Sequence, residues 1–204
     1  FSDRRTRRSM HEGVFGAGML GIYPVPVNWH YTPDEAEYLL NDSGVKLLVI
    51  HADLLEPVRS VIPPGLPVVI VPTPPEVRAA YCLPDEPPPA GYPLWGDLVA
   101  AAAPWAGEPG IAPSSIIYTS GTTGRPKGVR RAAFTEEQNE AVSFMLGWSY
   151  GYSEVLAGRR DPATITTAVI GPVYHSAPNA HSAFSIRVGA NVVITPRFDA
   201  EDLL

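Results

Sequence analysis

The amino-acid sequence predicts an α/β fold with mostly parallel sheets flanked by helices. Two near-continuous apolar runs, Val45–Ile50 and Val68–Val71, are typical of strands covered on both faces. Capped helix patterns alternate with such runs, as expected for parallel strands joined by helices. The composition, with 45% hydrophobic and 18% charged residues among 204, is that of an ordinary globular protein.

Residues 1–60 are predicted to form a first α/β segment with an incomplete front. The four arginines between residues 4 and 8 are expected to form a solvated tail. Thr32, Pro33 and Glu35 form the capping pattern of a helix that Gly44 ends. The other predicted elements are a small-residue helix (Val14–Leu20), a short strand interrupted by prolines (Ile22–Val27), the strand Val45–Ile50 and a short helix (Asp53–Ser60).

Residues 61–113 differ in composition, because 14 of the 23 prolines fall there. Proline at this density disfavours helix interiors and central strands. We therefore predict an irregular connection that contains the short strand Val68–Val71 and one short helix, Leu98–Ala103. A proline-rich recognition segment is the alternative, but the apolar Trp95 and Trp105 favour packing against the body of the protein.

Residues 114–204 are predicted to form a second α/β segment. Thr135 and Gln138 form another capping pattern, and Asp199 occupies the N-cap position of a further helix. The predicted strands are Ser115–Tyr118, Thr164–Ile170 and Asn191–Thr195, and the predicted helices are Thr135–Tyr150 and Ala177–Val188, the second closed by Gly189.

The string from Tyr118 to Val129 is the most informative feature for function. It carries Gly, Ser or Thr at seven positions and a single lysine, Lys127. Short residues let a backbone approach a polyanion and offer it N–H and hydroxyl donors, and the lysine adds positive charge. We interpret the string as a phosphate-binding loop, with a polar surface loop as the alternative. It is not a Walker loop, because Pro126 places Lys127 in a turn and not at a helix start.

The ordered string Thr119–Gly128 resembles the phosphate-binding signature of the adenylate-forming superfamily, which includes acyl- and aryl-CoA synthetases, luciferases and the adenylation domains of peptide synthetases. The resemblance implies that a carboxylate attacks the α-phosphate of ATP to give an acyl-adenylate and pyrophosphate, after which a thiol, usually that of CoA, displaces AMP. The nucleotide contacts that it implies are Thr119, Ser120, Gly121, Thr122, Thr123, Gly124, Lys127 and Gly128.

A second set of candidate functional residues follows the predicted strand Thr164–Ile170. A lone histidine at a strand end is usually structural, but Pro172, Tyr174 and His175 resemble the Pro-x-aromatic-His element of acyl- and aryl-CoA synthetases. That element lines the carboxylate pocket, which implies a catalytic role for His175 beside that of Lys127. The implied substrate pocket contains Tyr174, His175, Ser176, Ala177 and Asn179.

The same element distinguishes members of the superfamily. Domains that activate amino acids carry an aspartate at the position of His175, where it pairs with the substrate ammonium. Acyl- or aryl-CoA ligation is therefore favoured over amino-acid activation. The pattern around Asn28–His30 and from Tyr174 to Asn179 looks most like that of bacterial fatty-acid CoA ligases.

The resemblance runs from about Gly13 to Leu204, and family members are much longer. Their acidic Mg²⁺ ligand, the aspartate for the ribose hydroxyls and the C-terminal domain with its lysine cannot be located in this sequence. We therefore expect an N-terminal fragment of an ATP-dependent acid–thiol ligase that is inactive by itself. A truncated, non-catalytic relative that binds a nucleotide, an acyl group or a partner protein is the alternative.

Bulk properties exclude several classes of protein. The net charge of −6 argues against a nucleic-acid partner, and the single cysteine, Cys82, excludes an intrachain disulfide and favours the cytoplasm. The histidines at 11, 30, 51 and 181 show no metal-ligand spacing and are interpreted as structural. The apolar stretch Gly13–Val27 is too short for a membrane span, although lipid-like acyl substrates leave peripheral contact open. The acyl chain length and the oligomeric state have no sequence signal.

Overall fold

The structure, a computed structural model, describes residues 4–108, 110, 112–119 and 124–201, with residues 4–8 described by their backbone. The helices are α1 (Arg4–Met19), α2 (Pro33–Asp42), α3 (Ala52–Val58), α4 (Pro75–Tyr81), α5 (Trp95–Ala101), α6 (Glu136–Ser149), α7 (Ser153–Leu156) and α8 (Ser176–Arg187), with 3-10 turns at Arg59–Val61 and Pro162–Thr164. The strands are β1 (Leu48–His51), β2 (Val68–Val71), β3 (Ile117–Thr119), β4 (Lys127–Val129), β5 (Thr166–Val169) and β6 (Asn191–Ile194).

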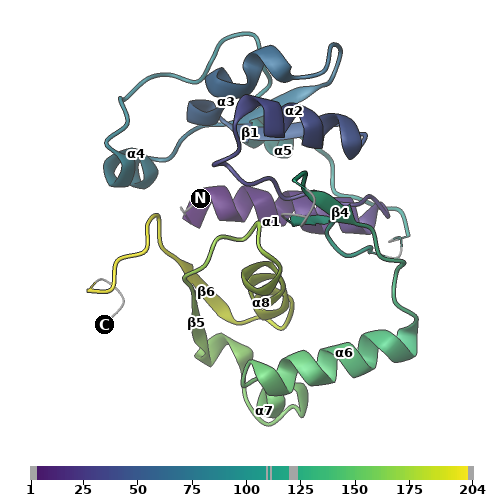
Figure 1. The fold of residues 1–204 in the computed structure, drawn as a ribbon. Helices are drawn as coiled ribbons and strands as arrows, with labels where there is room; N and C mark the ends of the chain where they lie inside the picture. The colour runs from purple at the N-terminus through teal and green to yellow at the C-terminus, as the bar shows by residue number, and fades with distance from the viewer. Residues whose placement is uncertain (1–3, 109, 111, 120–123, 202–204) are drawn as a thin grey trace.

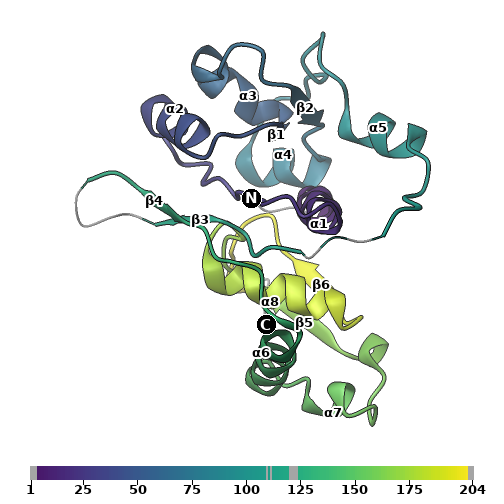
Figure 2. The same cartoon turned by 90° about the vertical axis from the view of Figure 1, so that its right-hand side faces the viewer.

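The described strands form three two-stranded sheets. β1 pairs with β2 in parallel, β5 pairs with β6 in parallel, and β3 and β4 form an antiparallel hairpin. Helix α1 lies between a layer that holds β1, β2 and helices α2–α5 and a layer that holds β5, β6 and helices α6–α8 (Figures 1 and 2). The predicted α/β fold with mostly parallel pairing is confirmed. No described helix has the length and hydropathy needed to cross a membrane.

Helix α1 contacts both layers through three consecutive side chains, those of residues 10–12. Met10 packs against the buried residues of the β5–β6 sheet, and Glu12 accepts a 2.9 Å hydrogen bond from the indole nitrogen of Trp95 at the start of α5. His11 Nε2 lies 2.9 Å from Ser182 Oγ in α8, in a buried contact. The Ser182 hydroxyl also lies 3.1 Å from the backbone oxygen of Asn179, so it has a polar neighbour in each of the two helices.

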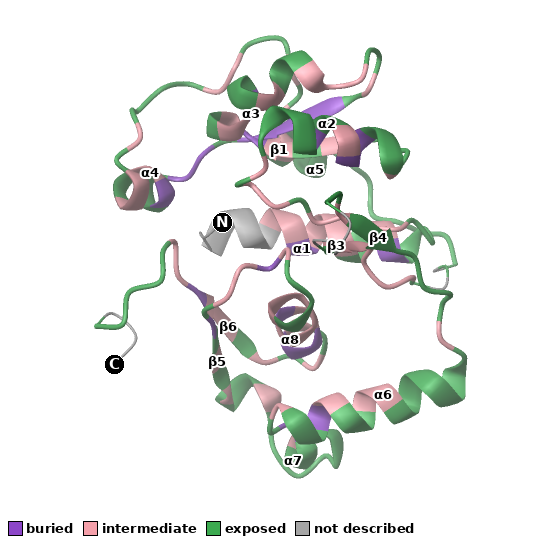
Figure 3. Cartoon of the chain, in the orientation of Figure 1, coloured by how far each residue is buried: buried purple, intermediate pink, exposed green. Residues whose placement is uncertain are grey.

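Two small hydrophobic cores support the parallel sheets. The first is built on Leu55, Val68 and Ile70, and β2 is buried at all of its positions, as Figure 3 shows. The second is built on Val169, Val173 and Ile194. The near-continuous apolar sequence of β2 therefore reflects burial on both faces, as expected for a parallel strand covered by helices.

The predicted helix signals are confirmed in their geometry. Thr32 and Thr135 each form a complete capping box with the residue three positions on, Glu35 and Gln138. Gly44 follows the end of α2 with a φ of +59°, a left-handed conformation that glycine adopts without strain.

Three expectations for residues 1–60 need correction. The arginines at 4, 5, 7 and 8 belong to α1 and not to a tail, and the predicted helix Val14–Leu20 is the second half of this longer helix. The segment Ile22–Val27 is not a strand. Pro24 and Pro26 have no backbone N–H to donate, and the segment accepts one hydrogen bond, from Ile116 N to Pro24 O at 2.9 Å.

Two expectations further along the chain also need correction. The connection at 61–113 contains α4, which the sequence prediction missed, and α5 begins at Trp95, three residues before the predicted helix. Pro74 and Pro75 precede or begin α4, where proline is compatible with a helix because no intrahelical donor is lost. Lys127, expected in a turn, begins strand β4.

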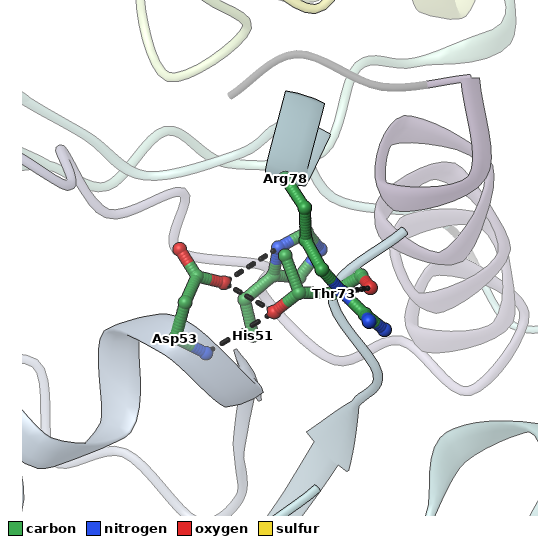
Figure 4. A network of polar contacts seen from close by, with 4 residues as sticks. All are labelled: His51, Asp53, Thr73 and Arg78. Carbon is green, nitrogen blue, oxygen red and sulfur yellow. Dashed lines mark hydrogen bonds and ion pairs between the residues drawn. The ribbon is translucent and has the colours of Figure 1, made fainter. Parts of the chain in front are cut away.

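A polar network joins the carboxyl ends of β1 and β2 (Figure 4). The Thr73 hydroxyl donates to Asp53 Oδ1 at 2.5 Å and accepts from the Asp53 backbone N–H at 3.2 Å, while His51 Nδ1 lies 3.5 Å from the same carboxylate oxygen. Arg78 donates to the backbone oxygen of Thr73 at 2.9 Å and pairs with Asp85. Burial would raise the pKa of Asp53, but the contacts with His51 and Thr73 outweigh it and hold this pKa below its usual value.

Truncation of the first core is expected to destabilise the chain strongly. Leu55 is fully buried, so Leu55→Ala removes apolar contacts and leaves a cavity, and we expect a loss of about 2–5 kcal/mol in the free energy of unfolding. Leu98→Ala in α5 is the matched control, because Leu98 is 46% exposed. Urea denaturation measures both, and an equal effect of the two substitutions would contradict the burial of Leu55.

Asp53→Asn is expected to destabilise the protein in a pH-dependent way. The folded-state pKa of Asp53 is lowered, so its contribution is present at neutral pH and is lost as the pH falls through that pKa, below about 3.8. We expect a deficit of about 1–3 kcal/mol at pH 7 that narrows toward pH 2.5. Urea titrations at several pH values measure this loss of stability, and Glu86→Gln is the control because Glu86 is exposed. A deficit that stays constant between pH 7 and pH 2.5 would contradict the lowered pKa of Asp53.

Candidate functional site

The hairpin of β3 and β4 carries the described part of the predicted phosphate loop. Its register pairs Tyr118 with Gly128 and Thr119 with Lys127. Thr119 and Lys127 are therefore cross-strand neighbours, although they are eight positions apart in the sequence. Of the other predicted nucleotide contacts, Gly124 is described, whereas Ser120, Gly121, Thr122 and Thr123 lie outside the described residues.

Two glycines of this hairpin are required for different reasons. Gly124 has a φ of +98°, a backbone conformation that side-chain-bearing residues rarely adopt. Gly128 lies against the ring of Tyr118, and a Cβ at this position would be 2.7 Å from two ring atoms. The placement of the Tyr118 ring therefore needs a residue without a side chain beside Lys127, whose own position in β4 is exposed.

Helix α2 contacts both arms of the hairpin. The Tyr118 hydroxyl donates a 2.6 Å hydrogen bond to Asp42 Oδ2 at the end of α2. Burial and the negative charge of Asp42 both raise the pKa of Tyr118 well above its usual value, so this hydroxyl keeps its proton. In the second arm, the guanidinium of Arg125 lies 5.0 Å from the ring centroid of Tyr38, one turn before Asp42.

The Tyr-His element forms a tight turn between β5 and α8. Val173 is buried, and its backbone oxygen accepts from the Asn179 side chain at 3.0 Å, while the His175 N–H donates to the backbone oxygen of Pro172 at 3.0 Å. His175 is the N-cap residue of α8, and its side chain makes no capping bond. Its ring centroid lies 4.6 Å from that of Tyr174.

The turn presents most of the predicted acyl-pocket residues to the surface. Those at 175, 176 and 177 are exposed, and Tyr174 and Asn179 are half-buried. Asn179 is also committed to the turn through its hydrogen bond to Val173, so its amide supports the backbone. The sequence offered no signal for this role, since an asparagine in the first turn of a helix commonly faces solvent.

Tyr31 connects the hairpin with the turn. Burial raises the pKa of Tyr31, and the neighbouring Glu35 carboxylate and Tyr174 phenol raise it further. Tyr31 in turn contributes to the raised pKa of Tyr118. Tyr174 is itself affected first by burial and then by Tyr81. These shared effects on the phenol pKa values are electrostatic, and they link Tyr31 to residues of both segments that the sequence predicted separately.

The described residues supply cationic and hydroxyl groups, but no metal site. They contain no cluster of His, Cys, Asp and Glu side chains that could hold a metal ion.

His181, interpreted from the sequence as structural, lies in a polar and aromatic environment. Its Nε2 is 3.1 Å from the Thr167 hydroxyl, and its ring packs on Tyr150 with ring centroids 4.7 Å apart. Burial lowers its pKa, so it is neutral at pH 7.

Sequence reasoning missed three residues of this region. Tyr31, Tyr38 and Asp42 belong to the capped helix or its approach, where they have the appearance of ordinary surface residues. Their contacts with the hairpin join positions 76 or more residues apart, as in the pair of Tyr118 with Asp42. No local pattern encodes such a pairing, because it arises from the way the two layers meet.

Comparison with known proteins finds relatives that are named as fatty-acid ligases. The chain is 33% identical over 140 residues to the fatty acid–[acyl-carrier-protein] ligase ScoC of Streptomyces coeruleorubidus, covering 68% of this chain and 24% of that protein. It is 28% identical over 197 residues to the long-chain-fatty-acid–CoA ligase FadD13 of Mycobacterium tuberculosis, covering 91% of this chain and 32% of that protein. The chain therefore spans about a quarter to a third of the length of these relatives.

The fold is also similar to solved structures. The crystal structure of the anthranilate CoA ligase AuaEII in complex with anthranoyl-AMP superimposes with a TM-score of 0.63 and 25% identity, over 91% of this chain and 32% of that one. The family of AMP-binding enzymes matches residues 5–204, nearly the whole sequence. The hairpin signature, the α/β architecture and this match lead to one assignment: the chain belongs to the family of AMP-binding enzymes.

Proposed function

We propose that this chain is part of an ATP-dependent acid–thiol ligase that converts a fatty or aryl acid to its acyl-adenylate and then transfers the acyl group to CoA. The acyl-CoA and acyl-carrier-protein ligases among its relatives support the reaction class. Because the chain spans only part of their length, the activity is proposed for the whole protein. Residues 4–201 supply the loop for the nucleotide and one wall of the acid pocket.

The observation that carries the proposal is the β3–β4 hairpin. It sets Thr119 opposite Lys127 and requires glycine at 124 and 128. This arrangement fits a triphosphate, because a mobile ammonium and short residues at one turn can neutralise and cradle several phosphate oxygens. In the proposed reaction Lys127 offsets the charge that builds up as pyrophosphate leaves, which is an electrostatic contribution to the rate.

The Tyr-His turn supports an acid without an ammonium group. His175 is exposed at the start of α8, and residues 172–179 carry no carboxylate that could pair with a substrate cation. In this proposal Tyr174 and His175 frame the carboxylate of the substrate, and Ser176 and Ala177 border the acyl group. ATP enters this reaction as its Mg²⁺ complex, in which phosphate oxygens and waters supply most of the metal ligands. The single cysteine, Cys82, is exposed and fits the cytoplasm, where we place the enzyme.

Lys127→Ala in the full-length protein is expected to slow acid-dependent exchange of pyrophosphate into ATP by about 100-fold, as for loss of one group that stabilises transition-state charge. Lys46→Ala is the matched control, since Lys46 is an exposed lysine in the turn between α2 and β1. Isotope exchange at saturating acid measures both variants. An exchange rate in Lys127→Ala equal to that of the control would remove Lys127 from the reaction.

A panel of acids tests the substrate class. Fatty and aryl acids are expected to stimulate exchange by the full-length wild-type protein, and amino acids are expected not to, because His175 provides no negative charge for the ammonium. Chain lengths from short to long and substituted benzoates define the preference. Stimulation by amino acids alone would support amino-acid activation instead, and no stimulation by any acid would favour a non-catalytic relative.

A further inference from the structure

We propose that helix α2 is the positioning element of the phosphate-loop hairpin, and that Asp42 and Tyr38 fix the two arms of the hairpin through Tyr118 and Arg125. This inference rests on the proposed function, because that function gives the hairpin its role in binding the phosphates. It assigns a positioning role to two residues that lie about 80 positions before the hairpin. Neither residue belongs to the loop or to the Tyr-His turn.

The first arm is held by a charged hydrogen bond. Tyr118 donates to Asp42 Oδ2 at 2.6 Å, which is short for an O–H···O contact and typical of an ionised acceptor. Asp42 is the last residue of α2, whose own start is fixed by the capping box at Thr32. The acceptor is therefore carried by a helix that is anchored by buried Leu39 and Leu40 in the preceding turn.

The Tyr118 ring also contacts the second strand, at Gly128. It packs over Gly128 so closely that no Cβ fits between them, and Gly128 is the neighbour of Lys127. The hydroxyl at one end of the ring and the glycine under its face define one orientation for Tyr118. Since Tyr118 and Gly128 are register partners, this orientation also fixes the two strands that carry Thr119 and Lys127.

The second arm is held by a cation–π contact. The Arg125 guanidinium lies 5.0 Å from the ring centroid of Tyr38, and Tyr38 is half-buried one helical turn before Asp42. The two contacts come from one face of α2 and reach Tyr118 in β3 and Arg125 just before β4. Together they hold both strands of the hairpin to the helix at two points.

The first measurement does not depend on activity. Trypsin cuts after Lys127 only when the hairpin opens locally, and it does not cut between Arg125 and Pro126. Mass spectrometry of limited digests of the full-length protein gives the rate of cleavage after Lys127, and cleavage after Arg160, in the exposed turn before β5, is the internal standard. We expect Tyr118→Phe and Asp42→Ala each to accelerate the Lys127 cut about 3- to 10-fold, the effect of losing one hydrogen bond to a charged group at the surface.

Matched variants separate positioning from general loss of stability. The double variant Tyr118→Phe/Asp42→Ala is expected to behave like either single variant, because both remove the same interaction. Tyr38→Leu should accelerate the cut, whereas Tyr38→Phe keeps the aromatic face and should not. Tyr152→Phe is the control for stability, since it removes a buried 2.8 Å hydrogen bond to Ser185 far from the hairpin and should leave the Lys127 cut unchanged.

The second measurement addresses function. In acid-dependent pyrophosphate exchange, Asp42→Ala and Tyr118→Phe are expected to raise the KM for ATP about 3- to 10-fold with a smaller change in kcat, because they disturb placement of the loop and leave Lys127 in place. A wild-type protein without exchange would refute the proposed function alone, since the cleavage assay still tests the contacts. Wild-type cleavage and KM in both variants, or additive effects in the double variant, would overturn the inference.

Discussion

The packing of helix α1 between two small α/β layers is the constraint on which the rest of the structure depends. Within the described residues, each layer holds one parallel pair of strands, and such a pair cannot cover its own faces. Met10 completes one core, Glu12 binds Trp95 of the other layer, and His11 forms a buried hydrogen bond with Ser182. Because this hydrogen bond pairs the buried imidazole of His11 with the hydroxyl of Ser182, a polar residue at this position of the helix is compatible with stability.

The arrangement of the layers decides which residues surround the two segments of the candidate site. The β3–β4 hairpin and the Tyr-His turn belong to different segments; Tyr31 of the first layer helps to raise the pKa of Tyr118, and Tyr174 helps to raise that of Tyr31. Asp42 and Tyr38 of the same layer reach the hairpin directly. The first layer therefore acts on the site without contributing any residue of the nucleotide signature.

The sequence was most informative where structure is local. The capping boxes at Thr32 and Thr135 depend on a residue three positions away, and both are formed as predicted. Strand β2 was predicted at the residues where it lies, because a short apolar run between prolines has few alternatives. The prediction was wrong at Ile22–Val27, where apolar residues suggest a strand but two prolines remove the donors that a ladder needs. It also missed α4, because prolines that disfavour a helix interior are compatible with a helix start.

The sequence by itself indicated the family, which the match over residues 5–204 confirms, and it predicted the phosphate-loop residues, since an ordered string such as Thr119–Gly128 carries its chemistry in its residue types. Only the tertiary structure decided that Lys127 lies in a strand opposite Thr119, that Gly128 makes room for the Tyr118 ring, and that Asp42 receives the Tyr118 hydroxyl. The reason is physical: residue type fixes what a group can do, whereas its partners across 76 positions are set by how the two layers pack around α1.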